Sequence, residues 1–202
     1  MSNLTSMRDE ISPEDADRAV MYGFLGRMLQ AAPSDDDLAV LRSLSADDTP
    51  MGLLLGEISA SARDVAAVDL ARDYHDLFIG LGRGEFVPFG SYYLTGFLHE
   101  KPLAELRASM AGFGIERAEG VSEPEDHIAA LMQMMEGLIL GEFGQVASLD
   151  EQKQFFTAHI GSWAGHFFKD LAASGTSRFY SAVGALGEQF MAVEAEAFAM
   201  AQ

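Results

Sequence analysis

The sequence predicts an all-α protein, a single helical domain of about eight to ten helices. Apolar residues make up 49% of the chain, which is typical of a globular protein with a hydrophobic core. These residues recur at helical spacing in long segments, and no segment alternates in the manner of a β-strand. Glycines and prolines fall between the segments, where helices are expected to end.

Four helices are expected before residue 80. Residues 1–11 are predicted to form a tail, and Ser12 followed by Pro13 marks a helix start with proline at its first position. Ser34 and the three aspartates after it open a short second helix. A third helix is weakened by two internal glycines, and a firmer one follows it. The expected ranges are 12–33, 34–43, 51–62 and 63–78.

Residues 80–90 form the least regular segment, because they contain four glycines and a proline. The same segment holds Phe86, Val87 and Phe89, which is unusual for a solvated connection. A helix is expected to restart at Ser91 and end near His99, and another to run over 101–110. The glycine-bearing, charged stretch 111–122 is predicted to be a hinge between an N-terminal lobe (12–110) and a C-terminal lobe (123–202).

A helix is predicted over 123–142, with an acidic first turn and one apolar face. Ser122 and Glu125 have the spacing of a capping box, and acidic residues favour the first turn of a helix. On a helical wheel His127 falls at the rim of the apolar face and Asp126 on the polar side. A long helix over 150–171 and a last aromatic helix after Ser174-Gly175-Thr176 complete the prediction.

The composition excludes several classes of function. With 13 basic and 31 acidic residues the formal charge is −18. Such a surface repels nucleic acid, which is therefore not an expected partner, and it attracts cationic ligands, which are expected. The absence of cysteine excludes thiolate nucleophiles and cysteine-based metal sites. No apolar run has the length of a membrane span and the N-terminus lacks a signal-peptide core. A cytoplasmic protein without stable membrane insertion is expected.

Neither a metal centre nor a catalytic site is predicted. None of the five histidines belongs to a Glu-x-x-His or H-E-x-x-H motif. His159 and His166 are seven residues apart on one predicted helix, about 10 Å, too far to share an ion. Asp126 and His127 are neighbours on a helix and point about 100° apart, so they do not form a catalytic dyad with each other.

An aromatic cluster in residues 74–93 has two interpretations. Its side chains either fill the core between two lobes, or line a groove for an apolar peptide rimmed by acids. The aromatic residues concerned are Tyr74, Phe78, Phe86, Phe89, Tyr92 and Tyr93.

Three motifs follow one another in an order and at a spacing that resemble those of a known protein family. These are Tyr74-x-x-Leu77-Phe78, Pro88-Phe89-Gly90-Ser91-x-Tyr93-Leu94 and Glu123-x-x-Asp126-His127. Their order and spacing resemble the TorD/DmsD/NarJ-like chaperones, which are redox-enzyme maturation proteins, and the resemblance covers nearly the whole chain.

The resemblance implies a non-enzymatic cytoplasmic chaperone without a cofactor of its own. Such a protein binds the twin-arginine signal peptide, or the body, of a molybdopterin oxidoreductase precursor until the molybdenum cofactor is inserted. Asp126 and His127 match the family's peptide-recognition positions, Glu123 and Pro124 frame that turn, and residues 86–93 match its other conserved surface. Many relatives have a tryptophan and extra prolines at 87–90, where this chain departs from the pattern. The sequence of residues 83–93 resembles that of relatives associated with formate dehydrogenases. The implied peptide-binding residues are Tyr74, Phe78, Phe86, Pro88, Phe89, Ser91, Tyr92, Tyr93, Glu123, Pro124, Asp126 and His127.

The residue chemistry fits this function. A twin-arginine leader offers two guanidinium groups followed by an apolar stretch, and Asp126 can accept bidentate contacts from arginine. His127 is expected to orient a carboxylate or to titrate near neutral pH. We expect the aromatic loop and the Asp126 turn to form one groove across the hinge. The alternatives are a chaperone of the same fold that binds the mature client or its cofactor, a metal- or nucleotide-dependent hydrolase, or a plain scaffold protein. Both a monomer and a domain-swapped homodimer are compatible with the sequence.

Overall fold

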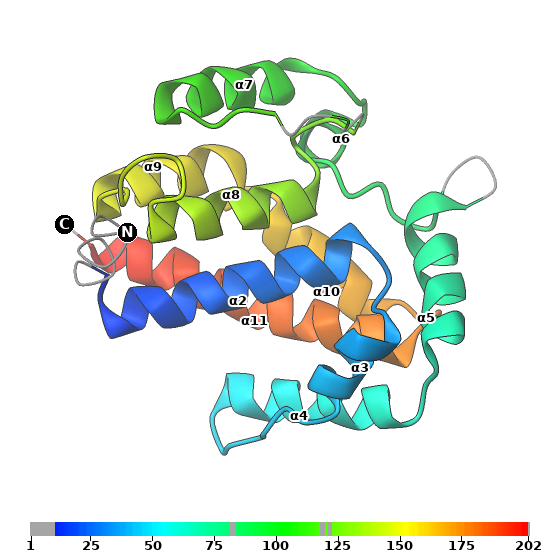
Figure 1. The fold of residues 1–202 in the computed structure, drawn as a ribbon. Helices are drawn as coiled ribbons and strands as arrows, with labels where there is room; N and C mark the ends of the chain where they lie inside the picture. Colours follow the sequence, from blue (N-terminus) through cyan, green and yellow to red (C-terminus); the bar gives the residue numbers. More distant parts are fainter. Residues whose placement is uncertain (1–10, 81–83, 118–119, 121–122, 202) are drawn as a thin grey trace. The chain divides into compact units, whose positions relative to one another are not determined.

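The computed structural model describes residues 11–80, 84–117, 120 and 123–201, and within them the protein is all-α (Figure 1). The described residues form ten α-helices and a short π-helix, and they contain no β-strand beyond an isolated bridge between Phe89 and His127. The predicted fold class is confirmed. The elements are α2 (Pro13–Gln30), α3 (Asp35–Leu41), α4 (Pro50–Arg63), α5 (Ala67–Tyr74), η1 (His75–Ile79), α6 (Gly90–Thr95), α7 (Lys101–Phe113), α8 (Ile128–Leu140), α9 (Leu149–His159), α10 (Ala164–Ala173) and α11 (Arg178–Met200).

The described chain divides into two compact units that do not coincide with the predicted lobes. The first unit contains residues 11–27, 89–162 and 201, and the second contains 28–88 and 163–200. The predicted hinge at 111–122 falls inside the first unit, because α7 and α8 on its two sides belong to the same unit. The chain passes between the units after residues 27, 88 and 162 instead.

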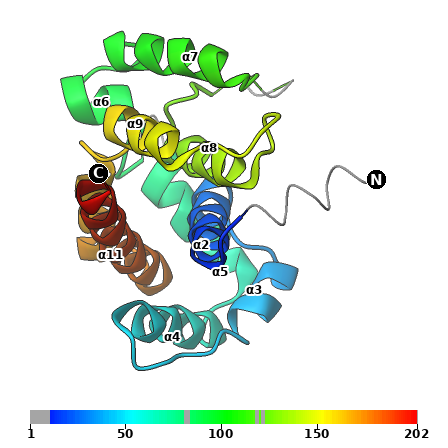
Figure 2. The same ribbon diagram turned by 90° about the vertical axis from the view of Figure 1, so that its left-hand side faces the viewer.

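In the first unit, α8 is buried along most of its length. Its predicted apolar face is confirmed, since Ile128, Leu131, Met132, Met135, Leu138 and Ile139 are all buried. The C-terminal half of α2 packs on it closely because Gly26 has no side chain: a Cβ there would lie 3.3 Å from the carbonyl oxygen of Ala129. Helix α9 lies beside α8 in both views (Figures 1 and 2).

In the second unit, α10 and α11 form a tightly packed pair, and α11 also packs on α4. The pair approaches closely at Gly184, where a Cβ would lie 2.8 Å from the backbone carbon of Leu171. Phe167, Phe168 and Leu171 of α10 are fully buried. The predicted last helix is α11, and of its apolar residues Phe179, Val183, Leu186 and Phe190 are buried, whereas Val193 is 40% exposed.

The structure differs from the predicted boundaries of two helices, those expected over 150–171 and 123–142. The helix expected over 150–171 is two helices, α9 and α10, because Ile160 and Trp163 leave the helical backbone region on either side of Gly161. The helix expected over 123–142 is α8, which begins at Ile128 and not at Glu123, with His127 as its N-cap. Glu125 is held by Arg107 and Arg117, and Ser122, the other member of the predicted capping box, lies outside the described residues. Within the described ranges, no helix combines the length and the apolar character needed to cross a bilayer.

Candidate functional site

Two predicted site segments, 89–91 and 126–127, meet in the first unit and form what we call the Asp126 junction. Phe89 and His127 pair as an isolated antiparallel bridge, and the Gly90 N–H donates to the Asp126 carbonyl oxygen at 2.9 Å. The Asp126 side chain adds a further bond, since its Oδ2 accepts from the Ser91 N–H at 2.7 Å. The junction therefore joins the start of α6 to the start of α8.

Two side-chain oxygens at the Asp126 junction are buried without a hydrogen-bond partner among the described residues. They are the Oδ1 atom of Asp126 and the Oγ atom of Ser91. Asp126 is only 3% exposed and Ser91 is fully buried. A buried polar atom left unpaired costs about 1–3 kcal/mol, so the junction holds acceptor capacity that the fold itself does not use.

His127 is a buried, neutral cap of α8. Its Nδ1 accepts a hydrogen bond from the Ala129 N–H at 3.2 Å, and its ring meets Phe89 edge-on at 5.0 Å between centroids. Burial lowers the pKa of His127 to about 4, although the charge of Asp126 acts in the opposite direction. The expectation that His127 titrates near neutral pH is therefore wrong, because desolvation of the imidazolium outweighs its acidic neighbour.

The carboxylate of Glu125 is already occupied by two arginines of the same unit. Arg107 donates to its Oε2 at 2.8 and 3.1 Å, and Arg117 lies 3.7 Å from Oε1. Burial alone raises the pKa of Glu125, but the hydrogen bond and charge of Arg107 and the charge of Arg117 outweigh it, and the pKa is lowered. Arg117 also donates to the Glu123 carbonyl oxygen at 3.0 Å. Glu123 is exposed and Pro124 half-buried, so this turn is held from α7 and from Arg117.

An exposed apolar segment follows the junction, and sequence reasoning missed it. Tyr92 and Tyr93 are half-buried, with their rings in edge contact at 6.5 Å. Beyond them Leu94, Phe97 and Leu98 are exposed, Phe97 by 69%. Glycine at position 96 turns the backbone with a φ of +82°. The apolar residues grouped around this glycine were a signal that could have identified the surface.

The remaining predicted aromatic residues lie in the second unit and form a separate cluster around Tyr180. Phe78 contacts Tyr74 at 5.0 Å and Tyr180 at 5.6 Å between ring centroids, and Phe86 contacts Phe167 at 6.3 Å. Tyr74 also donates to the Gln30 carbonyl oxygen at 2.9 Å. Pro88 is buried, whereas Tyr74, Phe78 and Phe86 are half-buried. These contacts give the cluster a packing role in its own unit, and its place in a common groove stays a prediction.

A hollow, which we call the α7 groove, lies in the first unit and was not predicted. It has a volume of about 600 Å³ and is formed by the C-terminal end of α7, the end of α8, the α8–α9 loop and α9. Phe113, Leu138 and Phe143 provide its apolar wall. Its lining comes from three helices and a loop, so no local pattern in the sequence marks the groove. Among the described residues, no group of three or more histidine, aspartate and glutamate side chains could hold a metal ion.

Known proteins match this chain over most of its length. The family model described as "Nitrate reductase delta subunit" matches residues 44–169. The "Chaperone protein TorD" of Aliivibrio fischeri is 25% identical, covering 92% of this chain and 96% of its own. The TorD chaperone of Vibrio cholerae O1 El Tor is 24% identical, covering 92% and 93%. A solved structure described as a redox enzyme maturation protein from Archaeoglobus fulgidus has a TM-score of 0.57 at 20% identity, covers 87% of this chain and 93% of its own, and supports the fold.

Proposed function

This chain belongs to the nitrate reductase delta subunit family, and we propose from that membership that it is a cytoplasmic chaperone for the precursor of a molybdopterin oxidoreductase. It binds the twin-arginine leader of the precursor and holds the protein for cofactor insertion before export. The predicted resemblance to TorD-like maturation chaperones is confirmed by the family match and by the curated relatives. Those relatives are named chaperones, which agrees with the prediction that the chain is not an enzyme.

The observation that carries the proposal is the unused acceptor capacity of the Asp126 junction. Oδ1 of Asp126 is a buried carboxylate oxygen without a donor among the described residues. An arginine side chain supplies several N–H donors and a permanent positive charge, so it is the natural partner of such an oxygen. Because Asp126 is 3% exposed, leader binding on this proposal includes a local opening of the 89–91 segment.

The test is a calorimetric titration of the intact protein with a synthetic twin-arginine leader. The leader of a formate dehydrogenase is the first choice, because the sequence of residues 83–93 resembles that of relatives associated with those enzymes. A leader with lysines in place of both arginines is the control, since lysine cannot make the bidentate contact. We expect the arginine leader to bind at least about tenfold more tightly. Equal affinity for both leaders, or none for either, would refute leader recognition.

A second candidate function is binding of the mature client body, and the exposed apolar segment favours it. Leu94, Phe97 and Leu98 present apolar surface that a folded or partly folded client can cover. On this alternative, substitution of Phe97→Ser weakens capture of the client lacking its leader. Unchanged capture by the Phe97→Ser variant would leave leader binding as the better explanation.

A further inference from the structure

We propose that Glu125 receives the second arginine of the leader, and that Arg107 occupies this carboxylate as an exchangeable partner while no leader is bound. This inference rests on the proposed function and extends it from one arginine to the pair, because Oδ1 of Asp126 accounts for one arginine only. Glu125 lies at an unspecified position of the motif Glu123-x-x-Asp126-His127, so the resemblance to known chaperones assigns it no role.

The contact between Arg107 and Glu125 has the chemistry of the contact that a leader arginine would make. Two N–H groups of the Arg107 guanidinium, at Nε and Nη2, donate to Oε2 of Glu125 at 3.1 and 2.8 Å. Every arginine carries the same planar group with the same fork of donors. A leader arginine can therefore replace Arg107 bond for bond at this oxygen.

Glu125 requires a cation at all times, because it is only 8% exposed. Burial raises the pKa of its carboxyl, but the hydrogen bond and charge of Arg107, together with the charge of Arg117, outweigh burial and lower the pKa. A buried carboxylate that loses its partner is strongly destabilising. Arg107 therefore leaves only when another cation takes its place, and the process is an exchange.

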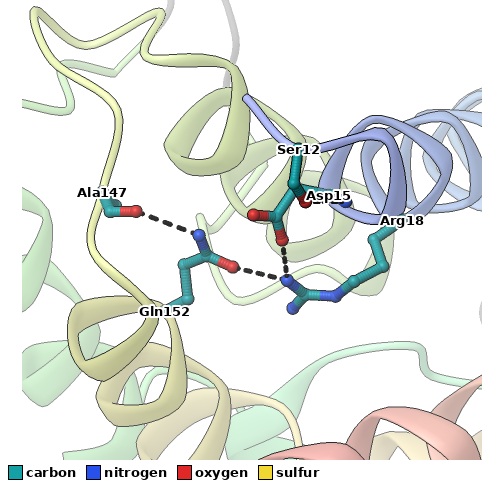
Figure 3. Close-up of polar contacts among 5 residues, drawn as sticks. All are labelled: Ser12, Asp15, Arg18, Ala147 and Gln152. Atoms are coloured by element: carbon teal, nitrogen blue, oxygen red, sulfur yellow. Dashed lines mark hydrogen bonds and ion pairs between the residues drawn. The ribbon is translucent and has the colours of Figure 1, made fainter. Parts of the chain in front are cut away.

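Arg107 is held weakly enough to be exchanged. Its side chain is 50% exposed, and among the described residues its guanidinium donates to Glu125 alone. Arg18 is a contrasting, structural arginine of the same unit (Figure 3). Its side chain is 18% exposed, and its guanidinium donates to both Asp15 and the buried Gln152. A half-exposed guanidinium such as that of Arg107 returns to water at small cost.

The two carboxylates point toward different elements, and so do the side chains of two consecutive arginines. Asp126 bonds to Ser91 on α6, and Glu125 bonds to Arg107 on α7. Helices α6 and α7 pack on each other in the first unit. Consecutive Cα atoms are about 3.8 Å apart in any trans chain, and neighbouring side chains of an extended segment point to opposite sides. An extended arginine pair along the turn sends one guanidinium toward α6 and the other toward α7.

The exchange makes recognition depend on both arginines. Arg107 is tethered beside Glu125, so a leader with one arginine takes the unused acceptor of Asp126 and leaves Arg107 in place. Once the first arginine is bound, the second lies beside Glu125 and competes at a high effective concentration. Loss of the contact at Asp126 therefore removes the contact at Glu125 as well.

The experiment is a calorimetric titration of three full-length proteins with three leaders. The proteins are wild type, Arg107→Gln and the matched control Lys101→Gln, which removes a cation of the same helix paired with Glu105 at 3.0 Å. The leaders carry either both arginines or glutamine in place of one arginine or the other. We expect Arg107→Gln to bind the two-arginine leader about tenfold more tightly than wild type does, because the competitor is gone. Its affinity for the single-arginine leaders should change no more than that of Lys101→Gln.

The outcomes separate the exchange from the proposed function. If wild-type protein binds the two-arginine leader but Arg107→Gln binds it no more tightly, or gains equally for all three leaders, the exchange is wrong and leader recognition stands. A stronger gain for the two-arginine leader alone supports the exchange. If wild-type protein binds none of the leaders, the proposed function and this inference both fail.

Nuclear magnetic resonance follows the same exchange on unmodified protein, so the test does not depend on the folding of Arg107→Gln. The Nε–H signal of Arg107 is assigned by its absence in Arg107→Lys, which keeps the positive charge. In the protein without leader this N–H donates to Glu125. A saturating two-arginine leader should move the signal to the position of a water-exposed arginine, and the single-arginine leaders should leave it unchanged. A signal that stays in place with the two-arginine leader would overturn the exchange.

Discussion

Asp126 and His127 both bind the backbone of this protein, and that explains why they are buried. Oδ2 of Asp126 accepts from the Ser91 N–H, and Nδ1 of His127 accepts from the Ala129 N–H. The sequence could predict that this turn starts a helix beside an apolar face. It could not predict the cap, because the carboxylate of Glu125 is taken by Arg107, 18 residues earlier in the chain. No local spacing rule marks such a pairing.

The neutral state of His127 makes a prediction about stability and pH. The unfolded chain takes up a proton on this imidazole near its ordinary pKa of 6.5, and the folded protein only at about 4. Between these values the unfolded state binds more protons, so His127 stabilises the fold above pH 6.5 and this stability is lost as the pH falls to 4. The expected loss is about 3 kcal/mol.

Denaturant titrations at several pH values check this on His127→Asn, which keeps a cap acceptor and cannot titrate. We expect the variant to lose much of the acid-dependent decrease in unfolding free energy. The buried His159, whose pKa is lowered mainly by burial, accounts for part of what remains. His166→Asn, at an exposed position, is the control and should behave like wild type. An unaltered pH profile in His127→Asn would contradict the assignment.

At the scale of elements, the apolar periodicity predicted the helices well and their interruptions poorly. The stripe of Phe156, Ile160, Trp163 and Phe167 is buried throughout, so it has the spacing of one helix although the backbone breaks at 160–163. The break coincides with the passage from one unit to the other after Ser162. Likewise the helix expected over 63–78 continues as α5 and the π-helix His75–Ile79. Tertiary packing decided these points, and local propensity did not.

The close packing of α10 against α11 determines at which glycines a larger side chain would destabilise the fold. Gly184→Ala places a Cβ 2.8 Å from the backbone carbon of Leu171, and a backbone atom cannot rotate away. We expect a loss of about 1–3 kcal/mol in unfolding free energy. Gly165→Ala, on α10 but with no heavy atom within 4 Å of its Cβ, should be neutral or more stable by about 0.5–1 kcal/mol. Chemical denaturation of both variants measures this, and equal stabilities would show that the pair is not packed as described.

At the scale of the whole molecule, the charge of −18 acts in opposite directions on folding and on binding. Mutual repulsion of the carboxylates destabilises the compact state, and salt screens it. The same carboxylates attract a cationic leader, and salt weakens that attraction. The sequence alone predicted the acidic net charge, which depends on composition, and the family resemblance, which depends on the order of the motifs. It did not predict the α7 groove, which three helices and a loop create together.

Salt should therefore raise thermal stability and lower leader affinity in the same protein. Going from about 0.01 M to 0.15 M ionic strength shortens the Debye length from about 30 Å to about 8 Å. Thermal melts should shift upward by a few degrees, while the dissociation constant of the arginine leader increases several-fold. A peptide of the same length without cationic residues is the control. If both quantities moved in the same direction, the acidic surface would not be the source of the attraction.

The central claim is that the Asp126 carboxylate receives an arginine of the leader, and one substitution tests it most directly. In Asp126→Asn the side-chain oxygen can still accept from Ser91, so the joint between α6 and α8 is kept while the charge is removed. Asp69→Asn, which removes an exposed carboxylate paired with Arg72, is the matched control. We predict that Asp126→Asn binds the arginine leader at least about tenfold more weakly and no longer distinguishes it from the lysine leader, with an unchanged circular dichroism spectrum. Wild-type affinity and discrimination in Asp126→Asn would contradict the claim and leave Asp126 as a structural residue.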